Sequence, residues 1–225
     1  MWQDKINKIN QQDCLELMKE MPDGCVDLCV TDPPYGVNYE GGAVNEFKRE
    51  KLVNDDSASI YEKIIPEIYR VMAKDSAAYI FYATSCEHDV FPMIKKVFGK
   101  YQQLIWFKTN TGFGAPAAHY HFDYEPFIFV RKGSPVWNGG GTKRSIWPMK
   151  KNPINDLHPT QKPLWLIQEM IQNSSDKGML VFDPFMGSWT TARACMEMER
   201  NFIGAELSAD YCEIGKQRLR QQVLL

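Results

Sequence analysis

Two apolar runs in this sequence each end in an aspartate followed by proline, and they constrain the fold more than any other feature. Residues 26–31 (VDLCVT) lead into Asp32-Pro33-Pro34-Tyr35, and residues 178–182 (GMLVF) lead into Asp183 and a glycine turn. Short runs rich in Val and aromatic residues predict buried strands. Proline ends a strand because it lacks a backbone donor and fixes φ. Each predicted strand therefore delivers a carboxylate to a stiffened turn.

Predicted strands and helices alternate along the chain. At the C-terminal end, a strand over 178–185, a turn over 186–189, a helix over 190–200 and a strand over 201–207 form a β-α-β unit, and Ser208 caps a last helix over 209–223. The earlier part predicts strands over 6–10, 26–31, 77–84, 102–109 and 125–132, and helices over 13–21, 60–72 and 86–98. This alternation predicts an α/β fold with a mainly parallel sheet covered on both faces.

Composition places the chain among soluble proteins with one large domain. It has 225 residues, 44% of them hydrophobic and 24% charged, enough for a sizeable core. The first residues are too polar for a signal peptide and the apolar runs are far too short to span a bilayer, so we expect a cytoplasmic protein without membrane contact. The six cysteines form no C-x-x-C pair and are expected as reduced thiols. His119 and His121 could ligate a metal, but without paired cysteines we expect no metal site.

Charge is distributed unevenly along the sequence. The net charge is −2, yet residues 95–162 hold eleven Lys/Arg against three acidic residues, a local charge of +8 that leaves −10 on the remainder. A basic stretch on an acidic body is typical of proteins that contact phosphates. A solvated basic face would look the same, and this alternative stays open.

Residues 133–157 interrupt the alternation of strands and helices. They are rich in Gly, Pro and Lys/Arg, with Trp137 and Trp147 interleaved, and predict an irregular insert rather than a sheet element. Aromatic rings among basic residues suit bases and phosphates, so the insert is a candidate target-recognition region. A surface loop remains the alternative.

The turn after the downstream strand is suited to a nucleoside. Gly187 lets the backbone approach a ligand, and the helix start behind it offers N–H groups. Glu206 lies nineteen residues beyond Gly187, about the spacing at which nucleoside-binding β-α-β units place an acid for a ribose diol. Because the chain has no G-x-G-x-x-G at this turn, a dinucleotide pyrophosphate fits poorly.

The turn after residues 26–31 is suited to an amino group on a flat heterocycle. Asp32 and the Pro33 carbonyl can each accept one proton of such an amine, while Tyr35 stacks on the ring. These two hydrogen bonds draw the nitrogen lone pair out of conjugation. The amine then becomes a nucleophile.

Three motifs together carry a family resemblance: DPPY at 32–35, HPTQKP at 158–163 and DPFMGS at 183–188. With these motifs the chain resembles the permuted (beta-class) amino DNA methyltransferases of the adenine-N6-specific type, in which the catalytic motif precedes the cofactor motif. Its size is similar to that of phage, prophage or restriction-modification enzymes. The resemblance implies a Rossmann-like methyltransferase fold and S-adenosylmethionine as cofactor.

The resemblance also implies roles for individual residues. An acid in the first position of the catalytic loop is typical of adenine-N6 enzymes, whereas cytosine-N4 enzymes usually carry serine. The resemblance assigns the catalytic loop to Asp32, Pro33, Pro34 and Tyr35, and the cofactor loop to Asp183, Phe185, Gly187 and Ser188. It assigns Glu206 to the ribose of the cofactor and Asp13 to its adenine. The methionine moiety is assigned to His158, Thr160, Lys162 and Pro163, with Lys162 neutralising the carboxylate.

The chain departs from the family in two places. Trp189 stands where the family's G-S-G-T-T carries its second glycine, so we expect that the backbone there cannot take a glycine-only conformation and that a bulky ring must be housed. The short insert over 133–157 predicts a short or relaxed recognition site. For DNA we assign Trp106, Lys108, Lys143, Arg144, Lys150 and Lys151, with Trp106 either stacked on a flipped base or part of the core.

The sequence thus predicts an enzyme that flips adenine out of DNA and methylates its exocyclic amine in a direct in-line transfer. Cytosine-N4, RNA and protein-glutamine methylation remain alternatives, since such a loop serves any planar amine or amide. A non-catalytic nucleic-acid-binding module would be expected to have lost Asp32 or Glu206, and both are present. DNA is the expected partner, and a homodimer is left open.

Overall fold

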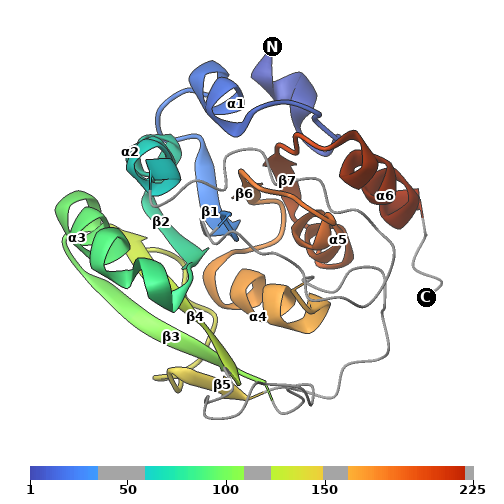
Figure 1. Cartoon of the computed structure of the whole chain (residues 1–225). Coiled ribbons are helices and arrows are strands. Elements are labelled where there is room, and N and C mark those ends of the chain that lie inside the picture. Colours follow the sequence, from blue (N-terminus) through green and yellow to red (C-terminus); the bar gives the residue numbers. More distant parts are fainter. Residues whose placement is uncertain (35–58, 109–122, 149–161, 221–225) are drawn as a thin grey trace, which may run out of the picture.

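The chain is described by a computed structural model that covers residues 1–34, 59–108, 123–148 and 162–220, and the structural findings below concern these residues. They form one sheet with helices on both faces, as Figure 1 shows. The predicted α/β class is confirmed.

The sheet of the described residues has seven strands in the order β5-β3-β4-β2-β1-β6-β7. The pairs β1–β2, β1–β6, β6–β7 and β3–β5 are parallel, whereas β4 is antiparallel to both β2 and β3. Six strands therefore share one direction, as a mainly parallel sheet requires, and β4 alone among them is reversed. The strands are β1 (Val26–Thr31), β2 (Met72–Phe81), β3 (Tyr101–Phe107), β4 (Tyr124–Lys132), β5 (Ile146–Pro148), β6 (Leu180–Asp183) and β7 (Asn201–Gly204).

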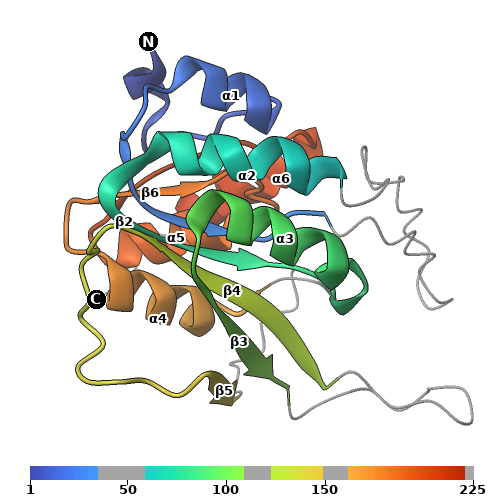
Figure 2. The ribbon, with the colours of Figure 1, turned by 90° about the vertical axis from the view of Figure 1, so that its left-hand side faces the viewer.

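Helices lie on both faces of the sheet (Figure 2). Two separate hydrophobic clusters are buried between the helices and the sheet. One face carries α1 (Cys14–Glu20), α2 (Ser59–Val71) and α3 (Glu87–Phe98); the other carries α4 (Leu164–Ser174), α5 (Thr190–Glu197) and α6 (Ala209–Arg220). On α2, Ile60, Ile64 and Ile68 recur every fourth residue and pack into the first cluster. Both faces of the central strands are thus removed from water.

Three elements differ from the sequence-based expectation. Residues 146–148 were placed in an irregular insert, but β5 pairs in parallel with β3 and buries Trp147 beside Trp106. The edge strand expected over 6–10 does not form; a 3-10 helix (Trp2–Lys5) comes first, and Gln11 makes an isolated bridge to Glu206. Helix α4 was not anticipated. Its first residue follows Pro163, which occupies the N-cap.

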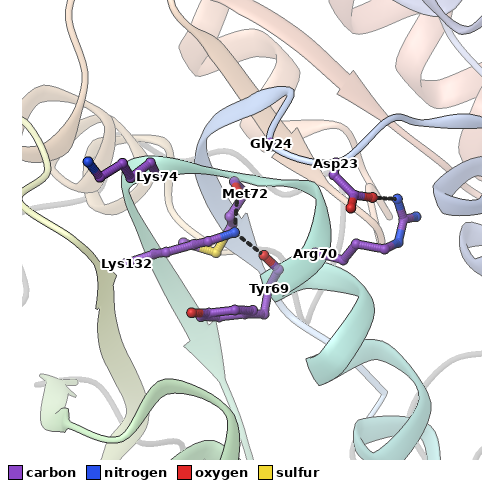
Figure 3. Close-up of a pocket in the computed structure, with 7 residues that line it drawn as sticks. All are labelled: Asp23, Gly24, Tyr69, Arg70, Met72, Lys74 and Lys132. Carbon is purple, nitrogen blue, oxygen red and sulfur yellow. Dashed lines mark hydrogen bonds and ion pairs between the residues drawn. The ribbon is translucent and has the colours of Figure 1, made fainter.

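A cavity of about 470 Å³ lies at the edge of the sheet where β2 begins (Figure 3). Two of the cations that line it have structural contacts: Lys132 Nζ donates to the carbonyls of Tyr69 and Met72 at 2.7 Å each, and Arg70 pairs with Asp23 at 2.9 Å. Lys132 thereby satisfies carbonyls at the end of α2. This cavity is at the amino ends of the parallel strands, away from the turns singled out above.

All six cysteines are thiols without a disulfide, as expected. Among the described helices, none is both long and apolar enough to cross a bilayer.

Candidate active site

The two aspartate turns lie side by side. Strands β1 and β6 are parallel neighbours, with Cys29 opposite Phe182. Asp32 and Asp183 therefore lie at the carboxyl ends of adjacent strands, on the same side of the sheet. Figure 1 shows both strands at the centre of the molecule. The turn that can hold an amine and the turn that can hold a nucleoside therefore face a common space beyond the strand ends.

Asp183 is buried and organises its own turn. One carboxylate oxygen accepts a hydrogen bond from the Phe185 N–H at 3.0 Å, and the other accepts one from the Thr191 hydroxyl at 2.6 Å. Burial, together with the smaller effect of the negative charge of Asp32, raises the pKa of Asp183 to about 7 despite these bonds. Asp183 thus ties the end of β6 to the first turn of α5.

Glu206 joins the glycine turn to the N-terminal segment. Its carboxylate accepts from the Gly187 N–H and the Ser208 N–H, both at 2.8 Å, and its backbone bonds to Asn10 and Gln12 at 3.1 Å each. Burial raises the pKa of Glu206. The spacing of nineteen residues has therefore placed the acid directly on the turn.

Asp13 caps α1, accepting from the N–H groups of Leu15 at 2.8 Å and Glu16 at 3.2 Å. This is the structural role that any aspartate at a helix start can play, and it is compatible with a ligand role. Asp13 follows Gln12, which bonds to Glu206, so the cap lies beside the glycine turn.

Arg218 is a residue of this site that the sequence did not reveal. Its guanidinium donates to the Ser188 carbonyl at 2.5 Å and to the Thr190 hydroxyl at 3.0 Å, so α6 fixes the cofactor loop from behind. From the sequence alone, Arg218 is expected only to stabilise the C-terminal end of its helix through the helix dipole. Burial lowers the pKa of Arg218, which is 9% exposed.

Trp189 corrects the expectation about the cofactor loop. Its φ is 64° and its ψ 29°, so a tryptophan does occupy the left-handed conformation that glycine adopts easily. The indole is completely buried, lies near Phe202 edge-on, and covers Gly215 of α6. The burial of this ring offsets the backbone strain.

Lys162 lies between two carboxylates. Its ammonium contacts Asp32 Oδ2 at 2.5 Å and Glu125 Oε2 at 3.0 Å, and it lies 4.7 Å from the centre of the Phe81 ring. Burial alone would lower the pKa of Lys162, but Asp32 and then Glu125 raise it above the usual value. The sequence assigned this lysine to a cofactor carboxylate, whereas here it is paired with the catalytic candidate Asp32.

Lys108 and Trp106 lie next to this group. Lys108 forms an ion pair with Glu125 and places its ammonium 4.6 Å from the centre of the Trp106 ring. Trp106 is 7% exposed and belongs to the core cluster shared with Trp147. The structure thus places Trp106 in the core, one of its two expected roles, and a contact with a flipped base stays a prediction.

The remaining predicted site residues divide into two groups. Lys143 is paired with Glu169 of α4 at 3.2 Å, and Arg144 is exposed, its carbonyl accepting from the Trp147 indole at 2.9 Å. Tyr35, Lys150, Lys151, His158 and Thr160 lie outside the described residues. Among those that are described, no three His, Cys, Asp or Glu side chains gather into a metal site.

Comparison with known proteins shows which proteins the chain is similar to. A model of the DNA methylase family matches residues 26–217. The DNA adenine methyltransferase YhdJ of Escherichia coli (strain K12) is 29% identical over 92% of this chain and 80% of that protein. The type II methyltransferase M2.MboI of Moraxella bovis is 28% identical over 97% of this chain and 89% of that protein.

Solved structures share the fold. The complex of M1.HpyAVI with SAM superposes with a TM-score of 0.71 and 26% identity, covering 94% of this chain and 98% of that chain. The cytosine-N4-specific PvuII DNA methyltransferase has a TM-score of 0.77 at 15% identity, covering 98% of this chain and 91% of that chain, a likeness of fold alone.

The packing of Trp189 on Gly215 predicts the effect of a methyl group. A Cβ on Gly215 would lie 2.4 Å from Cδ1 of the Trp189 indole, so Gly215→Ala should lower the free energy of unfolding by about 1 to 3 kcal/mol. An interior helical glycine would otherwise gain stability from alanine. Urea unfolding measures the change, and Gly141→Ala, whose Cβ meets nothing within 4 Å, is the control. A more stable Gly215→Ala protein would contradict this packing.

The raised pKa of Asp183 predicts a pH dependence of stability. Because its folded-state pKa is about 7 and the usual value is 3.8, the folded protein holds a proton that the unfolded chain has released. Asp183 therefore favours folding below about pH 4, and this contribution falls as pH rises to about 7. Compared with Asp183→Asn, the wild type should lose a few kcal/mol of unfolding free energy between about pH 4 and pH 7. If the unfolding free energies of the two proteins change with pH in parallel, Asp183 ionises normally.

Proposed function

The chain belongs to the DNA methylase family, and from that premise we propose that it transfers the methyl group of S-adenosylmethionine to the N6 amine of adenine in DNA. One observation carries the proposal: Asp32 at the end of β1 and the Asp183 turn at the end of β6 leave neighbouring parallel strands at the same edge. A target amine at one turn and a methyl donor at the other would meet there.

The residues of the second turn fit S-adenosylmethionine. Gly187 has a φ of 48° and a side without a Cβ, so the backbone can lie close to a nucleoside. We assign Glu206 to the ribose hydroxyls, Asp13 to the adenine of the cofactor, and the turn of Phe185 and Ser188 to its remaining contacts. Carboxylates around this space complement a cation. When bound, the cofactor supplies an electrophilic methyl group on a sulfonium.

The reaction requires an oriented amine. Asp32 and the carbonyl of the buried Pro33 accept its two protons, with Pro34 and Tyr35 completing the loop, and the nitrogen lone pair is directed at the methyl group. After transfer, the amine's proton leaves to Asp32 or to water. A covalent intermediate is unnecessary, and burial raises the pKa of Cys29 and Cys195 well above the ordinary value, which suits neither thiol to act as nucleophile.

Adenine in duplex DNA must leave the base stack to reach this edge, which costs a few kcal/mol. The acidic first position of the loop favours adenine over cytosine. YhdJ, the relative named above, is called a DNA adenine methyltransferase, which supports the same target.

We assign residues 133–157 to recognition of the DNA target, with Lys143, Arg144, Lys150 and Lys151 on phosphates and Lys108 near them. The pairing of Lys143 with Glu169 does not oppose this assignment, because partly exposed ion pairs contribute little and can exchange for a phosphate. The short insert supports a short or relaxed recognition site.

We also propose that the protein acts in the cytoplasm, supported by its DNA substrate and its free thiols. The homodimer stays a prediction that light scattering of the purified protein can test.

The target assignment is tested by incubating the protein with radiolabelled S-adenosylmethionine and unmethylated DNA and then separating the nucleosides. We expect label on N6-methyladenine. Label on cytosine, on RNA only, or on no nucleic acid would each remove the adenine assignment.

Asp32→Ala should lower the rate of methyl transfer by about 10²-fold or more, since the amine loses its charged acceptor. The affinity for S-adenosylmethionine, measured by calorimetry, should change little. Asp4→Ala, which removes an exposed carboxylate at the N-terminus, is the matched control. Full turnover of the Asp32→Ala protein would disprove the role given to Asp32.

Phosphate contacts predict a salt effect. Lys143→Ala and Arg144→Ala should each reduce the slope of log affinity for DNA against log salt by about one. Fluorescence anisotropy measures this slope, and Lys177→Ala, at the opposite edge of the sheet beside Glu199, should leave it unchanged. Unaltered slopes in both variants would assign these cations to a solvated face.

A further inference from the structure

We infer that Glu125 is a positioning residue for methyl transfer: acting through the ammonium of Lys162, it holds the Asp32 carboxylate in place. Lys162 then serves the catalytic carboxylate rather than the carboxylate of the cofactor. The inference rests on the proposed function, because it takes Asp32 as the acceptor of the target amine.

The reversed strand β4 is what brings Glu125 to this edge. Because β4 runs against its neighbours, its first residues, rather than its last, lie at the carboxyl ends of the parallel strands. Glu125 is paired with Trp106 near the end of β3. Lys162 directly precedes Pro163, the N-cap of α4. Glu125 and Lys162, which are far from β1 in the sequence, thus lie near its end.

Four alternating charges form a chain across this edge. Asp32 contacts Lys162 at 2.5 Å, Lys162 contacts Glu125 at 3.0 Å, and Glu125 pairs with Lys108. Lys162 is only 9% exposed, so its ammonium depends on both carboxylates for compensation. Burial would raise the pKa of Glu125, but Lys162 and then Lys108 lower it below the usual value. Each inner charge is therefore held between two opposite ones.

Other groups also face Asp32. Asp183 repels it from β6, and the hydroxyl of Tyr61, on α2, lies within its field. The ammonium of Lys162, in contact with Asp32 Oδ2, opposes the repulsion from Asp183.

Glu125 sets how strongly Lys162 can engage Asp32. Shared between two carboxylates, the ammonium fixes one oxygen of Asp32 and leaves the carboxylate a good acceptor for an amine. Without Glu125, the ammonium of Lys162 would interact with Asp32 alone of these two carboxylates. This stronger ion pair would make Asp32 a weaker hydrogen-bond acceptor for the amine. The pKa of Lys162 would also fall, because one of the two charges that outweigh its burial is gone.

The test compares Glu125→Gln, Lys162→Met, Lys162→Arg and the Gln/Met double variant with the wild type. For each protein we would measure the dissociation constant of S-adenosylmethionine by calorimetry and the single-turnover rate of methyl transfer to unmethylated DNA at saturating cofactor. The rates are followed from about pH 6 to pH 10. Glu199→Gln, which removes a carboxylate from the exposed pair with Lys177, is the matched control.

We expect Glu125→Gln to bind S-adenosylmethionine within about threefold of wild type and to transfer methyl at least about tenfold more slowly. Its rate should fall at lower alkaline pH than the wild-type rate, since Lys162 loses its proton earlier. Lys162→Arg should retain more activity than Lys162→Met. The loss in the double variant should be smaller than the product of the two single losses.

Two results would overturn the inference. One is a wild-type rate and pH profile for Glu125→Gln. The other is a tenfold or greater loss of cofactor affinity in Lys162→Met with no loss of saturated rate, which would return Lys162 to the cofactor; the affinity requires no DNA. If the wild type labels cytosine instead of adenine, the proposed target fails, and the same ratios measured on cytosine still decide the inference.

Discussion

The parallel pairing of β1 with β6 is the constraint on which the site depends. It places Asp32 and Asp183 at the ends of adjacent strands, where two carboxylates would repel each other if nothing intervened. The fold manages this repulsion in two ways. Asp183 is buried, with a raised pKa and two hydrogen-bond donors, while Asp32 is paired with Lys162. Adjacent positions in one sheet thereby give the two aspartates different surroundings.

The reversed strand gives this edge a second function. In a fully parallel sheet the residue at the start of β4 would lie at the opposite edge, and Lys162 would have Asp32 as its sole partner among these carboxylates. Because β4 is antiparallel, Glu125 joins the group and balances the charge. The local architecture of the sheet is thus linked to the chemistry proposed at the end of β1.

Local sequence signals predicted the elements whose stability is local. The strand over 26–31 has the predicted bounds, Asp13 caps a helix, and Glu206 lies on the turn of Gly187. The failures involve tertiary partners. β5 has only three residues, and it forms because it pairs with β3 and because Trp147 packs into a buried cluster. Trp189 adopts a left-handed conformation because Gly215 makes room for its ring, and the role of Arg218 depends on how α6 packs. None of these partners is near in sequence.

The central claim, that the two turns face one space, is most directly tested by a crystal structure of the protein with sinefungin, a cofactor analogue in which a carbon replaces the sulfonium sulfur and an amine replaces the methyl group. In the reactive complex the target nitrogen lies one hydrogen bond from the Asp32 carboxylate and one near-attack distance from the methyl position. The sinefungin amine, which occupies the methyl position, should therefore lie within about 6.5 Å of the Asp32 carboxylate. Sinefungin bound with its amine more than about 10 Å from Asp32, or at the opposite edge of the sheet, would contradict the account.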